Sequence, residues 1–146
     1  MNCLLTCGND SAQSVRLEIK MSEDFLGLFN QATDVVSLKP GQVLFEKGER
    51  GNYMYVVKSG EVTIGDGNHV FETLSAGGIV GEMALVDEQL RSATVRAISD
   101  AEVIPIDQRR FSFLVQQTPH FAIRVMRVMS ARLRAMNVRM TALSSP

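Results

Sequence analysis

The chain has 146 residues, of which 45% are hydrophobic and 21% charged, and its formal net charge is −1. This length and composition are typical of one globular domain and exclude a chain that is disordered throughout. No apolar run approaches the roughly 20 residues that cross a bilayer, and the polar, acidic N-terminus lacks the basic start and apolar stretch of a signal peptide. We therefore expect a cytoplasmic protein without a membrane span.

The N-terminal residues are predicted to form an extension followed by a helix. Residues 1–20 show no clear periodicity and contain a Gly-Asn-Asp-Ser cluster, which favours a flexible N-terminal extension. Ser22 is a suitable N-cap for a helix that continues through Phe29. The folded domain is therefore expected over residues 21–146.

Residues that commonly bind metals or catalyse reactions are few and scattered. Cys3 and Cys7 are the only cysteines, and neither has a nearby histidine or second cysteine pair to complete a zinc site. His69 and His120 are isolated from each other, and no nucleophile is paired with a base. We expect no catalytic or metal-binding residues and no enzymatic activity. The enzyme alternative, a cupin-like barrel, would need metal-binding histidines in a pattern that the chain lacks.

Short β-rich runs separated by turn residues occupy the middle of the chain. Turn pairs such as Pro40-Gly41 and Ser59-Gly60 stand between these runs. Many short strands at this spacing predict a sandwich or a barrel. The predicted strands are Val35 to Leu38, Val43 to Glu46, Tyr53 to Val57, Glu61 to Ile64, His69 to Leu74, Thr94 to Ile98 and Glu102 to Ile106.

The stretch from Gly81 to Val95 places a carboxylate and a guanidinium between two predicted strands. If residues 81–85 form a single helical turn, its free N–H groups provide a site for an anion. Arg91 can clamp the same anion with a bidentate, always-charged group. Glu82 cannot bind a phosphate, but its oxygens suit a neighbouring sugar hydroxyl. The pair therefore predicts a ribose phosphate ligand; the simpler alternatives are surface charges or a mutual salt bridge.

At these residues the sequence resembles the phosphate-binding cassette of the cyclic-nucleotide-binding domain family, which includes catabolite activators, protein kinase A regulatory subunits and cyclic-nucleotide-gated channels. The resemblance extends over about residues 22 to 140 and includes the runs 39–49 and 57–62. It implies an α+β fold: an antiparallel β-roll or jelly-roll barrel of about eight strands at 35–106, flanked by an N-terminal helix and by C-terminal helices at about 108–143. The residues that carry it most specifically are Gly81-Glu82, Ala84-Leu85 and Arg91-Ser92-Ala93-Thr94-Val95.

The resemblance also implies a ligand and a set of contacts. In the family, the Glu accepts a hydrogen bond from the ribose 2′-hydroxyl and the Arg pairs with the cyclic phosphate, roles that fall here on Glu82 and Arg91. The expected ligand is cAMP, with cGMP as the alternative; adenine is favoured modestly because Ser92 stands where some guanine-selecting relatives have threonine. The other expected contacts are Gly81 and the amides of Met83, Ala84, Ser92 and Ala93, the base-facing Val62, Phe71 and Leu74, and the helical lid residues Met136 and Asn137.

The C-terminal part is predicted to be helical. Asp107 can cap a helix over Arg109 to Gln116, and Thr118-Pro119 begins a longer one. We expect the apolar stripe of the longer helix to pair in a homodimer, although packing on its own barrel is the ordinary alternative. Five arginines are expected on the opposite face. The stripe consists of Ala122, Met126, Met129, Leu133, Met136, Met140 and Leu143, and the arginines are Arg124, Arg127, Arg132, Arg134 and Arg139.

Charge is divided unevenly along the chain. All 16 acidic residues lie up to Asp107, together with eight basic ones, and seven arginines follow, so the two parts carry about −8 and +7. A basic helix can bind nucleic acid, but we favour a solvated face, and we expect no direct DNA binding without a helix-turn-helix module. The prediction is a receptor that moves its C-terminal helices to signal to an unknown downstream protein. The alternative is a dimerisation domain with a vestigial cassette.

Overall fold

The computed structural model of the chain describes residues 27, 29, 34–87 and 89–144. The predicted extension at 1–20, both cysteines and most of the predicted helix from Ser22 lie outside the described residues. Of that helix, Gly27 and Phe29 are described, and Phe29 is buried in the core.

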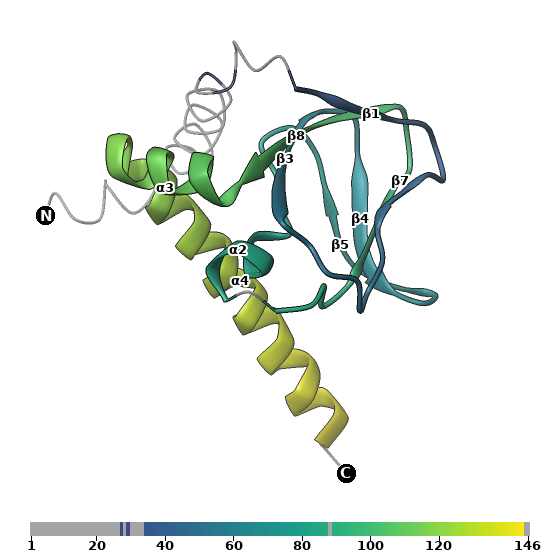
Figure 1. Cartoon of the computed structure of the whole chain (residues 1–146). Helices are drawn as coiled ribbons and strands as arrows, with labels where there is room; N and C mark the ends of the chain where they lie inside the picture. Colours follow the sequence, from purple (N-terminus) through teal and green to yellow (C-terminus); the bar gives the residue numbers. More distant parts are fainter. Residues whose placement is uncertain (1–26, 28, 30–33, 88, 145–146) are drawn as a thin grey trace, which may run out of the picture.

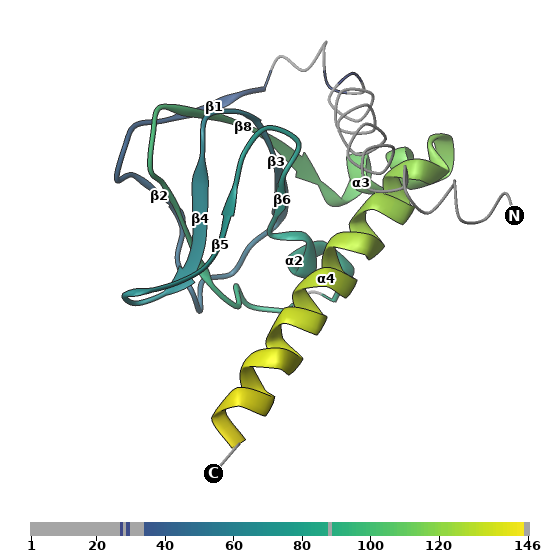
Figure 2. The same cartoon turned by 180° about the vertical axis from the view of Figure 1, so that it is seen from behind.

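Eight strands form two four-stranded antiparallel sheets, which face each other in a β-roll (Figures 1 and 2). This confirms the α+β β-roll expected from the sequence. The one strand that the sequence analysis missed is Ile79–Val80, which has two residues and is too short for a periodic pattern. The first sheet has the order β1 (Val36–Leu38), β8 (Ala101–Asp107), β3 (Tyr53–Ser59), β6 (Ile79–Val80), and the second β2 (Val43–Phe45), β7 (Thr94–Ala97), β4 (Val62–Asp66), β5 (His69–Leu74).

The two faces of the first sheet bury two separate clusters. On β3, Met54 and Val56 belong to a cluster shared with the helices, whereas Val57 belongs to the cluster between the sheets. On β8, Ile104 and Val103 divide in the same way. Because successive side chains of a strand point to opposite faces, a strand covered on both sides is apolar throughout. The first sheet is thus the central layer between the helices and the second sheet.

Two helices follow β8 directly. Helix α3 (Gln108–Gln117) begins at Asp107, whose carboxylate accepts a hydrogen bond from the Arg110 amide at 2.8 Å, as the N-cap prediction required. Helix α4 (Pro119–Ser144) has 26 residues, so it is about 39 Å long at about 1.5 Å per residue. It passes beside α2 (Glu82–Val86) and continues beyond the barrel (Figures 1 and 2).

The face of α4 that packs on its own domain differs in part from the predicted stripe. Phe121 and Val125 are buried, and Val128 and Met129 pack against the same cluster. Most of the other residues of the predicted stripe stay accessible: Met126, Leu133, Met136 and Met140 are exposed. The expected homodimer along this helix therefore stays a prediction. Within the described residues, no helix combines the length and apolarity that a bilayer span requires.

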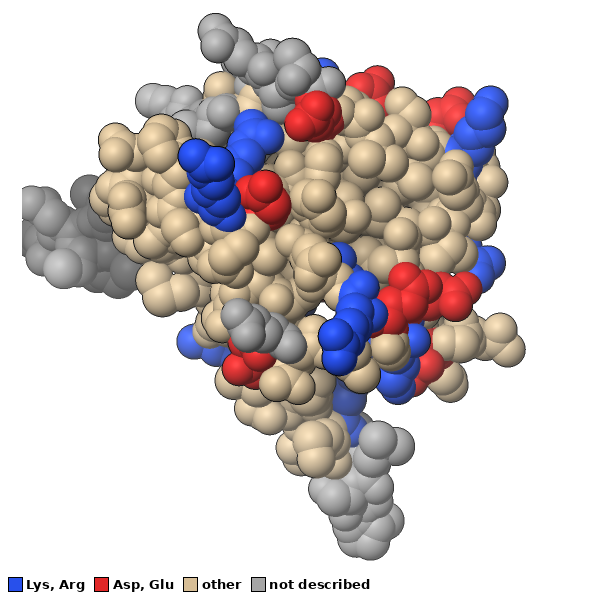
Figure 3. All heavy atoms as spheres, viewed as in Figure 1, with Lys and Arg blue, Asp and Glu red and all other residues tan. Residues whose placement is uncertain are grey.

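Acidic and basic side chains are interspersed on the face drawn in Figure 3, with wide uncharged areas between them. The described residues form no continuous basic patch on this side of the molecule. The arginines of α4 divide instead between solvent and contacts with the barrel, which are described below.

Candidate functional site

The predicted helical turn is present as α2, which begins directly after Gly81. Gly81 has a φ of +77°, a left-handed conformation that a residue with a side chain adopts only at a cost. A Cβ on Gly81 would lie 2.5 Å from Nη1 of Arg91 and 3.2 Å from the Tyr53 carbonyl oxygen. Glycine is therefore required here both for the turn and for the close approach of Arg91.

The backbone of Arg91 is held by the turn between β2 and β3. Its amide donates to the Glu49 carbonyl at 2.8 Å, and its own carbonyl accepts from the Gly48 amide at 2.8 Å. A Cβ on Gly51 would lie 2.1 Å from the guanidinium carbon, so this second glycine also leaves room for Arg91. The turn at residues 48–51, some 40 residues earlier in the sequence, thus positions Arg91.

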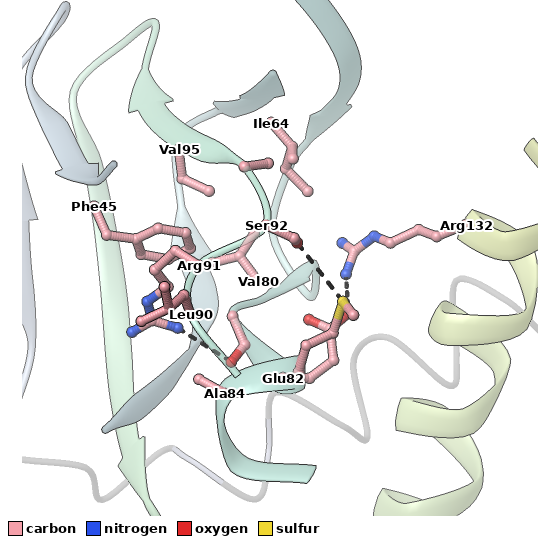
Figure 4. Close-up of a pocket in the computed structure, with 13 residues that line it drawn as sticks. Phe45, Ile64, Val80, Glu82, Ala84, Leu90, Arg91, Ser92, Val95 and Arg132 are labelled. Atoms are coloured by element: carbon pink, nitrogen blue, oxygen red, sulfur yellow. Dashed lines mark hydrogen bonds and ion pairs between the residues drawn. The ribbon is translucent and has the colours of Figure 1, made fainter. Parts of the chain in front are cut away.

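The Arg91 side chain is a buried cation that pairs with no carboxylate of the described residues. It is 6% exposed, and its guanidinium donates to the carbonyl oxygens of Tyr53 at 2.7 Å and Gly81 at 3.2 Å. The guanidinium carbon lies 4.0 Å from the ring centroid of Phe45 (Figure 4). Among the described residues, none forms an ion pair with it, and its Nε has no hydrogen-bond partner.

This environment disfavours the charge on Arg91. Burial lowers the pKa of its guanidinium, and the opposing effects of Tyr55, Glu49 and Glu82 do not restore it. A buried cation normally lies against an anion, since an unpaired buried charge is costly. An anion bound at Arg91 would supply the missing charge.

Glu82 is paired with helix α4 rather than with Arg91. Its carboxylate is 3% exposed and accepts a hydrogen bond from Arg132 Nη1 at 2.6 Å (Figure 4). The same guanidinium donates from Nε to Glu72 at 3.0 Å and from Nη2 to the Ile79 carbonyl. Burial lowers the pKa of Arg132, but Glu82 and Glu72 outweigh that effect and raise it overall. The expected alternative, a Glu82–Arg91 salt bridge, is absent among the described residues.

Two adjoining hollows open at this site. The first encloses about 70 Å³ around Arg91 and Glu82, which suits a group such as a phosphate but falls below the roughly 300–1,000 Å³ of whole-ligand pockets. The second encloses about 300 Å³ between β5 and α4. Residues that line both are Ile64, Met83, Ser92, Ala93 and Arg132. The hollows are therefore parts of one groove, wide enough together for a ligand larger than phosphate.

Most of the predicted site residues border this groove. Gly81, Glu82, Met83, Ala84, Arg91, Ser92 and Ala93 line the smaller hollow, and Phe71 and Met136 line the larger one. The Ser92 hydroxyl lies 3.6 Å from the sulfur of Met83, which ties the loop after α2 to the helix itself.

Three predicted contacts are not brought to the groove. Val62 has no exposed surface, lies in the cluster between the sheets and lines neither hollow. Leu74 packs against the same cluster and lines neither hollow. Asn137 is exposed and also lines neither hollow. Of the two residues predicted to form a lid, Met136 lines the larger hollow and Asn137 lines neither.

The sequence also left several lining residues unassigned, among them Phe45, Ile64, Arg132 and Arg139. Ile64 stands two residues after Val62 on β4, on the same face of the strand, and lines both hollows. Arg132 and Arg139 were expected on a solvated face of the helix; Arg132 is instead partly buried in ion pairs with Glu72 and Glu82, whereas Arg139 is exposed and also contacts β5. Arg139 donates from Nη2 to the Phe71 carbonyl at 3.0 Å, and its guanidinium carbon lies 4.7 Å from the Phe71 ring centroid.

The described residues contain no group of three or more His, Cys, Asp or Glu side chains arranged to hold a metal ion. The chemistry available at the groove is instead one of hydrogen bonding and charge: a guanidinium at the closed end, a carboxylate beside it, and an apolar opening.

Comparisons with known proteins agree with this geometry. Residues 35–118 match the family model of the cyclic nucleotide-binding domain. The chain is 29% identical over 109 residues to the cyclic AMP receptor protein of Thermus thermophilus, covering 71% of this chain and 50% of that protein. It is 28% identical over 109 residues to the lysophospholipase nte1 of Neurospora crassa, covering 71% of this chain but 7% of that protein.

A solved structure titled "cAMP bound PfPKA-R (141-441)" resembles the chain with a TM-score of 0.64 and 25% identity, covering 71% of this chain and 36% of that one. The chain thus spans half or less of the length of these relatives. The family model covers more than half of this chain, including the whole stretch from Gly81 to Val95. The chain belongs to the cyclic nucleotide-binding domain family.

Proposed function

We propose that the chain is a receptor domain that binds a cyclic nucleotide, cAMP or cGMP, and signals through its C-terminal helix. The observation that carries the proposal is the buried guanidinium of Arg91 at the closed end of the groove, which forms no ion pair with the described residues. A cyclic phosphate bears one negative charge and two exocyclic oxygens, which a guanidinium can pair in bidentate fashion. Such an anion offsets the cost of burying Arg91.

The remaining parts of a cyclic nucleotide have matching places along the groove. With the phosphate at Arg91, Glu82 is the neighbouring acceptor for a ribose hydroxyl. The base then extends into the larger hollow, against Phe71 and Met136. The family relatives support this ligand class, since one is named a cyclic AMP receptor and another was solved with cAMP bound.

Signalling would follow from the bond between Glu82 and Arg132. Glu82 would contact the ribose from the cassette (residues 81–95), while Arg132 belongs to α4. A ligand that changes the position of Glu82 changes the anchor of α4, provided that it binds one position of the helix better than the other. We propose a binding domain rather than an enzyme, working in the cytoplasm and passing the helix movement to a partner protein or a tethered domain.

Calorimetric titration with cAMP and, separately, with cGMP tests the proposal. We expect micromolar or tighter binding of at least one nucleotide by the unmodified chain. Arg91→Lys keeps a charge but loses the bidentate fork, and Arg91→Met keeps length without charge, so both variants should lose at least about tenfold in affinity. Arg96→Lys, on the exposed part of β7, is the matched control.

Circular dichroism and thermal unfolding establish that each variant is folded before titration. A folded, unmodified chain that binds neither nucleotide at several temperatures would overturn the proposal. The dimerisation domain with a vestigial cassette would then be the better account.

A further inference from the structure

Two basic side chains, Arg132 and Arg139, line the larger hollow, where the base would lie, and only Arg132 is bonded to Glu82. Arg132 gives hydrogen bonds to three acceptors, and Glu72 is one of its partners. Arg139 has a single hydrogen bond, from Nη2 to the Phe71 carbonyl. Since a guanidinium carries five N–H donors, Arg139 retains donors for a ligand in this hollow.

Arg139 is also held in place by its surroundings. Its bond to the Phe71 carbonyl and its position 4.7 Å from the Phe71 ring fix the guanidinium against β5. Phe71 itself is 40% exposed and lines the same hollow, so its ring offers a surface on which a base can stack. A donor held beside a stacking surface is suited to the edge of a purine.

We infer that Arg139 is a specificity-determining residue that favours cGMP over cAMP by donating to the base; this inference rests on the proposed function. The O6 and N7 atoms of guanine are two adjacent acceptors, which match an arginine. Adenine presents N7 beside an N6 amino group, whose hydrogens oppose those of the guanidinium. This preference is opposite to the modest adenine preference expected from Ser92, whose hydroxyl lies against Met83.

Asn137 does not compete for this role. It was expected to recognise an adenine amino group, but it is exposed and lines neither hollow. Within the described part of α4, the polar side chains that line the larger hollow are Arg132 and Arg139. Arg139 is therefore the residue of α4 that is placed to donate hydrogen bonds to the base.

The test is calorimetric titration of the chain with cAMP, cGMP and cyclic IMP, which keeps O6 and N7 but lacks the 2-amino group. We expect cGMP and cyclic IMP to bind at least about tenfold more tightly than cAMP. Arg139→Ala should remove this difference by weakening cGMP and cyclic IMP at least about tenfold more than cAMP. Arg134→Ala, on an exposed position of the same helix, should preserve it.

Several results would overturn the inference while leaving the proposed function intact. These are tighter binding of cAMP by the unmodified chain, a cGMP to cAMP ratio unchanged in Arg139→Ala, and equal weakening of all three ligands in that variant, which would assign Arg139 to helix docking. Tight cGMP with weak cyclic IMP would assign recognition to the 2-amino group instead. Binding of none of the three by a folded chain would overturn both proposals.

Discussion

Glu82 and Arg132 join the cassette to helix α4 through an ion pair of 2.6 Å, although they are 50 residues apart in the sequence. The carboxylate is 3% exposed, and Arg132 is the cation that pairs with it. The contact links the residue expected to touch a ribose with the helix expected to move. In the proposed function, this contact would connect ligand binding to movement of α4.

Removing Arg132 should destabilise the domain strongly. In Arg132→Met, Glu82 stays buried without its cation, a situation that costs about 3 kcal/mol in free energy of unfolding. The measurement is urea denaturation followed by circular dichroism. The double variant Arg132→Met with Glu82→Gln should recover part of the loss, and Arg134→Met is the exposed control. Equal stability of Arg132→Met and the unmodified chain would show that the pair carries no stability.

Replacing Gly81 should lower the stability of the domain by more than its positive φ alone would cost. Gly81→Ala combines a φ of +77° with a Cβ placed 2.5 Å from Arg91 Nη1. Gly67→Ala is a matched control, because Gly67 has a φ of +61° and an added Cβ there would meet nothing within 4 Å. We expect about 1 kcal/mol of lost stability for Gly67→Ala and clearly more for Gly81→Ala. Equal losses in denaturation experiments would argue against tight packing of Arg91 on this turn.

The N-cap of α3 should contribute measurably to stability. Asp107→Ala removes the acceptor of the Arg110 amide and should lower the free energy of unfolding by about 1 kcal/mol. Thermal unfolding of this variant can be compared with Asp100→Ala, which changes an exposed aspartate outside any helix. The account of α3 fails if both variants unfold at the same temperature.

The exposed apolar side chains of α4 predict self-association. Leu133 is 59% exposed and lies at the centre of the stripe formed with Met126, Met136 and Met140. We expect sedimentation equilibrium to detect a dimer that Leu133→Asp dissociates, because a charge cannot be buried in a helix pair without a partner. Arg134→Asp, at an exposed position farther round the helix from the stripe, is the control. A monomer at all concentrations would contradict the homodimer prediction.

The sequence predicted the framework well because its signals there are local. Alternation and turn residues located seven of the eight strands, and Asp107 and Pro119 marked the two helix starts. Gly81, Glu82 and Arg91 were identified from residue type and spacing, and the structure places all three around one hollow. Strand β6 was missed because two residues carry no period.

The errors concern which face of an element meets another element. Val62 and Ile64 share one face of β4, but only packing of the two sheets decides which of them is buried in the core. Arg132 looked like a solvated helix charge, because its acceptors are on β5, β6 and α2, which are 50 or more residues away. Such long-range pairs leave no local pattern in the sequence.

The most direct test of the central claim observes the Nε–H group of Arg91 by two-dimensional ¹H–¹⁵N NMR, with its signal assigned by comparison with Arg91→Lys. This donor is buried and has no partner among the described residues. Addition of cAMP or cGMP should shift the Arg91 signal, whereas adenosine or guanosine, which lack the phosphate, should leave it unchanged. An Arg91 signal that does not move when nucleotide binding is saturated would contradict the claim that Arg91 holds the cyclic phosphate.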